Sequence, residues 1–539
     1  MIAPIRQKAT EDPRVSCEKE ATEDPRVSRE SGAGDENLPS PFGRGAGGEG
    51  VRHEASHDAI PPDPTALTLT LSQGEREPES AAALTLTPSH GEREPGSAAS
   101  KNACKLCAPL GACLVFRGVE GAIPFLHGSQ GCATYIRRYM ISHFKEPLDI
   151  ASSSFGEITA IFGGRANLQA GLENVIRQYA PQLIGIASTC LAETIGDDVN
   201  FHLREIIAEA KQPLPPLVSV STPSYAGTHV EGFHAAVRAL VDGLTTAGPA
   251  HQAINVFPGM VSPADLRYLK EMFRDFGLAA TILPDYADTL DGPAWNEYHR
   301  IPPGGTPVEA IRRMSGARAT IEFGSTWDGT QTAGALLEKR FGVPRYELPL
   351  PIGVTQTDQL VDVLCKLAER PLPERHEAER GRLVDSYVDS HKYVFGKRAV
   401  VYGEPDLVVG LASLLAEVGV TPAVCASGAN SGRLVEHITA LEPELAGDVA
   451  TLEGVDFTEI ESHASRQTLD LAVGSSKGYG LSRRLKIPLI RVGFPIHDRA
   501  DGPRVLHVGY RGAQQLFDRV VGALIGVAQD ASPVGYSYM

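Results

Sequence analysis

Three cysteines, Cys107, Cys132 and Cys190, are the residues of this sequence best suited to carry chemistry. Cys107 opens "CAPLGA", Cys132 closes "HGSQGC" and Cys190 ends "LIGIASTC", so each lies beside small and polar residues. A cysteine of a hydrophobic core usually lies among aliphatic side chains and needs no glycine next to it. Gly128 and Gly131, close to Cys132, indicate instead that the backbone approaches another group or turns where a side chain would clash. What these thiols do then depends on their spacing.

The three cysteines are separated by 25 and 58 residues. Thiolates bind zinc and iron–sulfur clusters, and a structural zinc site usually takes its ligands as local CxxC or HxxxH pairs. Eight cysteines in 539 residues do not make a disulfide framework. In a reducing cytoplasm, clustered cysteines are metal ligands or redox groups more often than bridges. The spacing leaves two alternatives open: buried structural cysteines, or a cluster whose ligands the fold brings together.

Length and charge limit the class of protein. The formal net charge of −16 argues against nonspecific binding to nucleic acid or to an anionic membrane. No apolar run approaches the roughly 20 residues that span a bilayer, and "MIAPIRQKATEDPRVS" lacks the apolar segment of a secretory signal. We therefore expect a cytoplasmic protein with neither nucleic acid nor membrane as a partner.

The first hundred residues are repetitive. "ATEDPRVS" occurs at 9–16 and at 21–28, and "LTLTLSQGEREPESAA" (67–82) returns almost unchanged at 84–99. These repeats are rich in Glu, Arg, Pro, Gly and Ser and contain no aromatic residue, so they cannot bury enough apolar area to offset the entropy of ordering. The sequence predicts a disordered extension over residues 1–100, in which Cys17 is incidental.

After residue 100, short apolar runs alternate with amphipathic stretches. Eight runs of four to eight residues that end in Gly, Ser or Pro are typical of buried strands; among them are "QLIGIAST", "AINVFPG" and "RAVVYG". Stretches such as "PADLRYLKEMFRDFGL" between them predict helices. This alternation indicates β-α-β units with mostly parallel sheets. We expect three Rossmann-like α/β domains, at 101–250, 251–380 and 381–539.

Long motifs resemble one protein family. They are "CAPLGACLVFRGVEGAIPFLHGSQGCATYIRRY" (107–139), "SHFKEP" (142–147), "IFGGRANLQAGLENV" (161–175), "ASTCLAETIGDDV" (187–199), "TPSYAGTHVEGF" (222–233) and "GFPIHDR" (493–499). The sequence is similar to the β-type half of the nitrogenase component 1 superfamily. The resemblance implies three α/β domains, an α2β2 heterotetramer with a homologous α-type (NifE-like) subunit, and an iron–sulfur cluster at their shared interface. It also implies an ATP-dependent iron-protein reductase as a partner.

Residue by residue, the resemblance makes Cys107, Cys132 and Cys190 the ligands of that cluster. Ser224 matches a serine that can approach the cluster in catalytic β subunits, although a serine after proline more often bonds its own turn. Phe162, in a loop before "NLQAGLENVIRQY", matches an exposed aromatic that docks the reductase; the alternative is a core residue.

The remaining candidates are assigned structural roles. They are Cys104 and Cys113, which the family pattern does not select; Cys365 and Cys425, expected in the core; His127, His143 and His229, expected to form hydrogen bonds or lie on the surface; and "VGSSKGYG" (473–480), expected to be a strand-to-helix turn without the order of a phosphate loop.

Two roles within the family remain. The first is the β-type (NifN-type) subunit of the scaffold on which the iron–molybdenum cofactor precursor matures, with a [4Fe-4S] cluster. It is favoured by "CKLCAPLGA" (104–112), by "YIRRYMISHFKEPLDIASSSF" (135–155), by a folded part of about 440 residues and by the low-complexity N-terminus. The alternative is the catalytic β subunit of nitrogenase or a nitrogenase-like reductase, with an [8Fe-7S] relay cluster. No catalytic acid, base or nucleophile is assigned to this chain in either role.

Deletion of residues 1–98 tests the predicted extension. The truncated chain should keep the melting temperature of the full chain and its affinity for the partner subunit, because a segment that buries little contributes little stability. Calorimetry of the two chains checks this, and a large fall in melting temperature would show that the repeats pack on the body.

Overall fold

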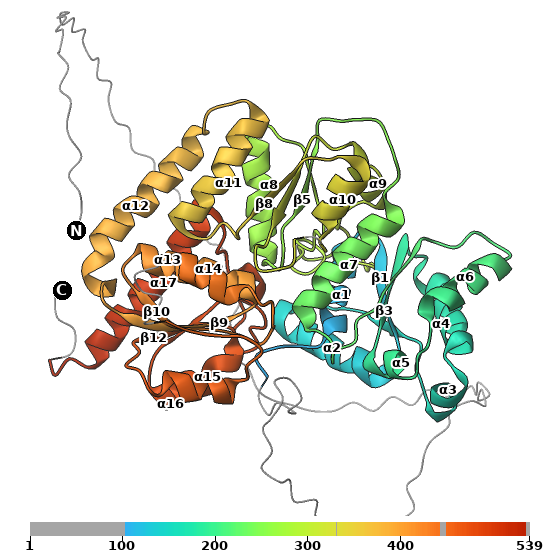
Figure 1. The fold of residues 1–539 in the computed structure, drawn as a ribbon, viewed down its shortest axis with the longest axis horizontal. Coiled ribbons are helices and arrows are strands. Elements are labelled where there is room, and N and C mark those ends of the chain that lie inside the picture. Colours follow the sequence, from blue (N-terminus) through green and yellow to red (C-terminus); the bar gives the residue numbers. More distant parts are fainter. Residues whose placement is uncertain (1–102, 330, 442–448, 535–539) are drawn as a thin grey trace, which may run out of the picture. The chain divides into compact units, whose positions relative to one another are not determined.

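The computed structural model describes residues 103–534 apart from 330 and 442–448. The extension predicted for residues 1–100, with Cys17, lies outside the described residues. Within them, the chain forms three parallel sheets covered by helices (Figure 1). The predicted α/β class with parallel sheets is confirmed. The sheets lie within 101–250, 251–380 and 381–539, and the division into three domains stays a prediction.

The first sheet contains the strands that precede the cysteine loops. Its order is β2-β1-β3-β4, and every pair is parallel. The strands are β1 Ala122–His127, β2 Ala151–Ser152, β3 Leu183–Ser188 and β4 Leu217–Val220. The helices of this part are α1 Ala108–Arg117, α2 Gln130–Phe144, α3 Glu157–Phe162, α4 Arg165–Tyr179, α5 Cys190–Thr194, α6 Val199–Glu209 and α7 His229–Leu244.

The sequence patterns missed the central strand β1. Its sequence, "AIPFLH", contains Pro124, and a proline argues against a central strand because it cannot donate to the ladder. All six residues are nevertheless buried, and Pro124 pairs with Gly185 of β3. A Cβ at Gly185 would lie 2.1 Å from the Phe116 ring, so the helix α1 packs directly on this part of the sheet.

The second sheet has the order β6-β5-β7-β8. Its strands are β5 Ile254–Phe257, β6 Ala280–Ile282, β7 Thr320–Phe323 and β8 Arg345–Leu348, with helices α8 Pro263–Asp275, α9 Val308–Arg312, α10 Ala333–Phe341 and α11 Gly353–Ala368 and the 3-10 turn η1 Met314–Gly316. The predicted helix α8 begins with a capping box, in which Ser262 and Asp265 bond each other's backbone N–H groups.

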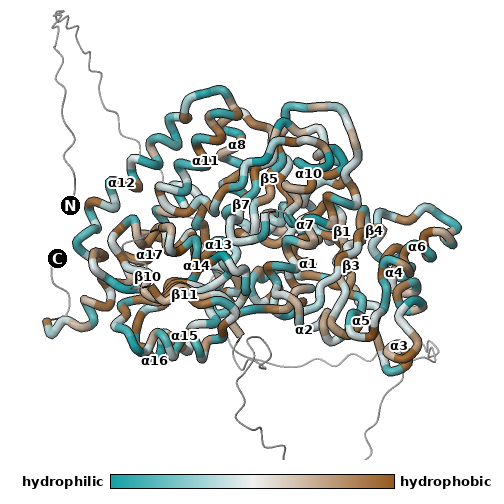
Figure 2. The backbone as a smooth tube through the Cα atoms, viewed as in Figure 1, coloured by the Kyte–Doolittle hydropathy of each residue, from teal (hydrophilic) through white to brown (hydrophobic). Residues whose placement is uncertain are grey.

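The third sheet has the order β11-β10-β9-β12-β13. Its strands are β9 Arg398–Gly403, β10 Thr421–Ser427, β11 Ala450–Leu452, β12 Leu471–Gly474 and β13 Leu489–Arg491. The helices are α12 Glu374–Val394, α13 Pro405–Glu417, α14 Leu434–Leu441, α15 Phe457–Ala464, α16 Tyr479–Leu485 and α17 Gly509–Asp530, with the 3-10 turns η3 Ser476–Gly478 and η4 Gly502–Arg504. Figure 2 shows hydrophobic residues gathered in these strands. The segment 473–480 is the expected strand-to-helix turn, from β12 through η3 into α16.

Helices α1 and α7 touch backbone to backbone. A Cβ at Gly111 of α1 would lie 1.8 Å from the His229 carbonyl oxygen, and one at Gly232 of α7 would lie 1.9 Å from the Ala108 carbonyl oxygen. The helices can approach this closely because glycine has no side chain at either crossing point. All of α1 is buried as a result, and Cys107 is the residue that caps its N-terminus.

A substitution at this crossing tests the contact. Gly111→Ala should destabilise the protein by about 1–3 kcal/mol or more, because the new methyl group forces two backbones apart. The control is Gly243→Ala at the exposed end of α7, where a Cβ meets only Val218 Cγ2 at 3.8 Å. There alanine should stabilise the helix by up to about 1 kcal/mol. Differential scanning calorimetry checks both, and equal melting temperatures would contradict the contact.

Candidate cysteine site

The three candidate cysteines lie at the N-terminal ends of three helices. Cys107 caps α1, Cys132 lies in the first turn of α2, and Cys190 begins α5. The helices α2 and α5 follow β1 and β3, which are neighbours in a parallel sheet, so their loops leave the same edge. Side chains at this edge are presented to one region, where helix N-termini favour negative charge.

Gly128 explains how the loops of Cys132 and Cys190 approach each other. Its φ is +155°, and a Cβ there would lie 1.8 Å from Thr189 Oγ1. The close approach expected from the glycines is therefore found at Gly128, against the residue that precedes Cys190. At Gly131 a Cβ would meet only Ser129 Oγ, at 3.7 Å, among the described residues.

Ser224 links the third loop to the other two. Its N–H donates to Cys190 Sγ at 3.3 Å, and its hydroxyl oxygen accepts from the Ala108 N–H at 3.2 Å. Ala108 is the first residue of α1, directly after Cys107. Ser224 thus joins the Cys190 and Cys107 loops, which is more than a bond within its own turn.

The pKa of the Cys132 thiol depends on both other cysteines. Burial raises its pKa, and the negative charges of Cys107 and Cys190 raise it further. Three thiolates that repel one another suit a cationic ligand, and soft thiolates favour iron–sulfur and zinc chemistry. Among residues 103–534, outside the two gaps, no three His, Cys, Asp or Glu side chains are arranged to hold a single metal ion.

The other described cysteines differ in burial. Cys425 is fully buried, as expected, and so is Cys113, whereas Cys365 is only half-buried at the edge of the core. Burial raises the pKa of Cys104 and Cys425 to about 12, and it raises the pKa of Cys113 as well. These thiols stay protonated at neutral pH and are poor ligands.

An open pocket of about 400 Å³ lies beside Cys107 and Ser224 and contains residues that sequence reasoning missed. Lys477 reaches it from η3, with its Nζ 5.9 Å from the centre of the Tyr139 ring. Tyr139 accepts a 2.9 Å hydrogen bond from Tyr135. Burial is the main cause that raises the pKa of Tyr139 to about 12. The segment 473–480 gave no signal of this role, because only the tertiary fold brings Lys477 next to Cys107.

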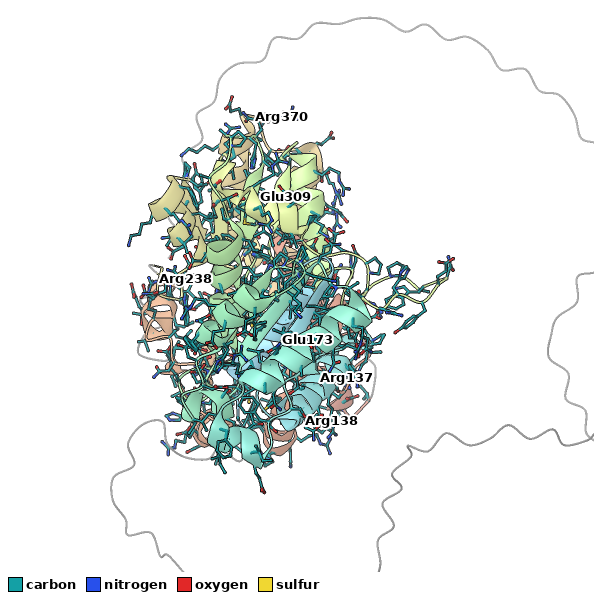
Figure 3. All side chains as sticks on the ribbon, turned by 90° about the vertical axis from the view of Figure 1, so that its right-hand side faces the viewer. Arg137, Arg138, Glu173, Arg238, Glu309 and Arg370 are labelled. Carbon is teal, nitrogen blue, oxygen red and sulfur yellow. The ribbon has the colours of Figure 1, made fainter. Side chains whose placement is uncertain are left out.

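Figure 3 shows the two arginines that follow Cys132 pointing outward from α2. Both are exposed, and Arg137 donates to the Leu148 carbonyl at 2.5 Å and lies 3.7 Å from Asp149. Within the described residues neither guanidinium hydrogen-bonds a cysteine, so these arginines belong to the surface of α2.

The three histidines near the motifs form hydrogen bonds, as expected, and all are buried. His229 accepts from the Leu106 N–H at 3.3 Å and pairs with Glu404 at 3.0 Å. His143 accepts from the Ile496 N–H at 2.9 Å, and burial lowers its pKa to about 3. His127 pairs with Asp197 at 2.8 Å.

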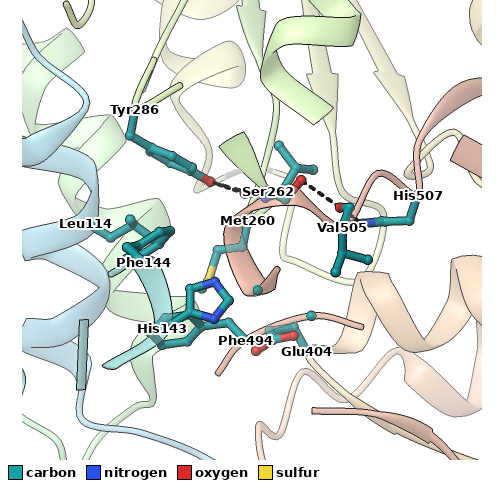
Figure 4. A pocket seen from close by; sticks show the side chains of 13 residues that line it. Leu114, His143, Phe144, Met260, Ser262, Tyr286, Glu404, Phe494, Val505 and His507 are labelled. Atoms are coloured by element: carbon teal, nitrogen blue, oxygen red, sulfur yellow. Dashed lines mark hydrogen bonds between the residues drawn. The ribbon is translucent and has the colours of Figure 1, made fainter. Parts of the chain in front are cut away.

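His143 and Glu404 line a cavity where elements of the three sheets meet (Figure 4). The cavity measures about 30 Å³. That is room for about two water molecules and not for a cluster or an organic cofactor. Tyr286 and Phe494 fill much of this junction.

Phe162 is the last residue of the short helix α3 and not part of a loop, as the sequence had suggested. It is 82% exposed, so it is not a core residue. Ile158 and Ile161 on the same helix are each 75% exposed. The three side chains form an apolar surface on α3.

Comparison with known proteins identifies the family. The model of the nitrogenase component 1 type oxidoreductases matches residues 107–525. The chain is 36% identical over 430 residues to the nitrogenase molybdenum-iron protein beta chain of Methanothermobacter thermautotrophicus, covering 78% of this chain and 93% of that one. It is 34% identical over 428 residues to the corresponding beta chain of Clostridium pasteurianum, covering 79% and 93%. It is 35% identical over 435 residues to a nitrogenase vanadium-iron protein beta chain of Trichormus variabilis, covering 78% and 92%.

A solved structure agrees with these relatives. A chain of "Nitrogenase Cp1 at pH 6.5" superposes with a TM-score of 0.79 at 31% identity and covers 83% of this chain and 98% of that one. This chain therefore belongs to the nitrogenase component 1 family, as a β-type subunit. Proteins of this family bind iron–sulfur clusters. No helix of the described residues is long and apolar enough to cross a membrane.

Differential alkylation of the iron-free chain tests the burial of the thiols. Iodoacetamide at pH 8 should modify the exposed Cys107 before Cys104, because with a pKa of about 12 only about one Cys104 thiol in 10⁴ is ionised at that pH. The fully buried Cys113 and Cys425 should stay unmodified over the same time. Tandem mass spectrometry separates the sites, and equal labelling of Cys104 and Cys107 would contradict this arrangement.

Proposed function

We propose that Cys107, Cys132 and Cys190 hold an iron–sulfur cluster that this chain shares with a homologous α-type subunit. Within that site we propose that the chain is the β-type subunit of the scaffold on which the nitrogenase iron–molybdenum cofactor precursor matures. The complex would be an α2β2 heterotetramer in the cytoplasm, where thiols stay reduced. It would receive electrons from an ATP-dependent iron-protein reductase.

One observation carries the cluster site: Cys107 and Cys190, from two other loops, are close enough to Cys132 for their charges to raise the pKa of the Cys132 thiol. Their donor set fits the group, because cysteine thiolates are the ligands of iron–sulfur clusters. Three thiolates from one chain also leave part of a cluster to be completed by another subunit. The cluster, when bound, would accept and pass on single electrons.

The chain's own residues would prepare this site in separate ways. The N-termini of α1 and α2 supply partial positive charge beside Cys107 and Cys132. The N–H of Ser224 donates to Cys190 Sγ, which stabilises that sulfur as a thiolate. Lys477 lines the pocket beside Cys107; burial lowers its pKa, and a thiolate at Cys107 favours its charged form. Together these groups offset the repulsion among three thiolates.

The scaffold role is supported by the motifs at 104–112 and 135–155. The length of the folded part does not support the scaffold role. The beta chains of molybdenum-iron proteins match over a similar 428–430 residues, which is 93% of their own length.

A catalytic β subunit is the second candidate. Ser224 favours it, because its hydroxyl lies 3.2 Å from the Ala108 N–H, next to Cys107, and is therefore at the edge of the site, which is compatible with the eight-iron alternative. The similarity to molybdenum-iron and vanadium-iron protein beta chains also favours it.

Metal analysis of the complex, purified with its partner under anoxic conditions, tests the cluster. Iron and sulfide should occur in multiples of about four per αβ pair. Cys132→Ala should lose much of this iron, because the removal of one thiolate leaves an iron open to solvent. The control is Cys365→Ala, which removes a thiol of α11 and should keep the iron. Full iron occupancy in a triple alanine variant of Cys107, Cys132 and Cys190 would overturn the assignment.

The same preparation separates the two roles. A scaffold complex should not reduce dinitrogen to ammonia with the reductase and ATP, and its interface should hold about four irons per pair. A catalytic subunit should support that reduction and hold about eight. Sustained ammonia formation by the purified complex would therefore replace the scaffold proposal with the catalytic one.

A further inference from the structure

A buried His–Asp–His cluster lies near the cysteine site and has no part in the proposed ligand set. Asp197 Oδ2 lies 2.8 Å from His127 Nε2, and Asp197 Oδ1 lies 2.7 Å from His202 Nε2. The side chain of Asp197 is 4% exposed and that of His127 is 0% exposed. His127 ends β1, Asp197 lies between α5 and α6, and His202 is on α6. One carboxylate therefore joins three elements.

The same carboxylate binds the loop between α3 and α4. The Gly164 N–H donates to Asp197 Oδ2 at 3.0 Å. A Cβ at Gly164 would lie 2.4 Å from that oxygen and 2.4 Å from Phe155 Cζ, so the loop is packed tightly here. Gly163, with a φ of +89°, makes the turn that follows Phe162. Only Gly163 thus separates the exposed Phe162 from Gly164, which makes the Asp197 contact.

Asp197 is also tied to the segment that contains Cys190. The Asp197 N–H donates to the Ala192 carbonyl at 3.0 Å, which closes the end of α5. At the other end of this segment, the Thr189 N–H donates to the His127 carbonyl at 3.0 Å. The short stretch 189–197 is therefore held at both ends by the pair His127 and Asp197, with Cys190 between them.

The hydrogen bonds to Asp197 are strong because its carboxyl group is ionised. Burial lowers the pKa of His127, which is therefore neutral at pH 7. Burial opposes ionisation of Asp197, but the hydrogen bonds from His202 and His127 outweigh it and lower the Asp197 pKa. Nδ1 of His127 and of His202 is buried without a partner among the described residues, so Nε2 is the nitrogen that carries the proton. An ionised carboxylate then accepts three N–H donors, and such charge-assisted bonds are short and strong.

We propose that Asp197 is a positioning residue that couples the docking of the reductase on Phe162 to the position of Cys190 in the cluster site. The inference rests on the proposed function, because it assumes both the cluster and the reductase. Pressure on α3 displaces the Gly164 backbone, and the carboxylate passes this displacement to the stretch 189–197. The link is made of short hydrogen bonds in a tightly packed region, where side chains have little freedom to absorb a displacement.

The test compares Asp197→Ala with Asp198→Ala in the complete anoxic complex. Asp198 is exposed and accepts from the Phe201 N–H at 2.9 Å as the cap of α6, so its variant removes a neighbouring carboxylate and keeps the cluster of hydrogen bonds. Single-turnover electron transfer from the reductase should slow about tenfold in Asp197→Ala, since coupling between sites changes equilibria by about 5- to 150-fold. In Asp198→Ala it should stay within about twofold of the parent.

Iron content and reduction by a small low-potential reductant separate coupling from damage. Both should stay within about twofold of the parent in Asp197→Ala, because the cysteines are intact and a small reductant does not use α3. Equal slowing with the reductase and with the small reductant would mean that the cluster itself is disturbed, which would overturn the proposal. So would identical behaviour of Asp197→Ala and Asp198→Ala.

A double variant tests whether Phe162 and Asp197 act together. Phe162→Ala should slow reductase-dependent transfer by several-fold and keep the iron content. With coupling, Phe162→Ala/Asp197→Ala should be no slower than the slower single variant, within about twofold. Multiplication of the two single effects would show independent residues and overturn the proposal.

Hydrogen exchange gives a readout that does not depend on the iron–sulfur cluster. Peptides over 163–168 and 190–197 should exchange about tenfold faster in Asp197→Ala than in the parent, because the Gly164 N–H loses its acceptor and the stretch 189–197 loses its bonds to His127 and His202. Asp198→Ala should not change them. Should Asp197→Ala fail to fold, Asp197→Asn keeps the shape with one oxygen fewer, and the same peptides should exchange faster in it than in the parent and in Asp198→Ala. A parent complex without iron would refute the proposed function alone, whereas unchanged exchange would refute the role of Asp197.

Discussion

The backbone contact between α1 and α7 is the constraint on which the site depends. Gly111 and Gly232 let the two helices cross without intervening side chains, and no other residue fits either position. The crossing fixes the start of α1, where Cys107 lies, against the start of α7, where His229 lies. The Leu106 N–H donates to His229 at that point, so the first cysteine loop is bonded to the crossing itself.

The same crossing connects the first sheet to the rest of the described chain. His229 continues through a buried 3.0 Å contact to Glu404, which caps α13 of the third sheet. On the second sheet, Asp265 of α8 accepts the N–H groups of His507 and Val508 at 2.8 and 3.1 Å. Buried polar groups of this kind are costly without partners, so each pair favours one arrangement of the elements. The junction is consequently filled by protein and leaves a cavity of about 30 Å³.

Against this rigid frame, the functional residues lie on loops at one edge of the first sheet. The thiols come from segments that start α1, α2 and α5, and the exposed apolar surface of α3 belongs to the same part of the chain as the first sheet. The closely packed helices and sheets can hold a charged group between the thiolates and still present the apolar surface of α3 to a partner. Asp197 bonds the α3–α4 loop through its carboxylate and the Cys190 segment through its backbone N–H.

The sequence by itself determined the class of fold, most of the strands and the family. Strands such as β3, β9 and β10 are continuous apolar runs because both faces of a parallel sheet are covered, and this pattern is local. The short strands β2, β6, β8 and β11 and the proline-containing β1 were missed, since their pairing comes from neighbours and not from their own residues. Only the tertiary structure decided that Ser224 contacts Cys190, that Lys477 reaches Cys107, and that Asp197 joins three elements. These contacts join residues far apart in the chain, and hydrogen-bond distances and burial depend on how helices cross, which no local pattern encodes.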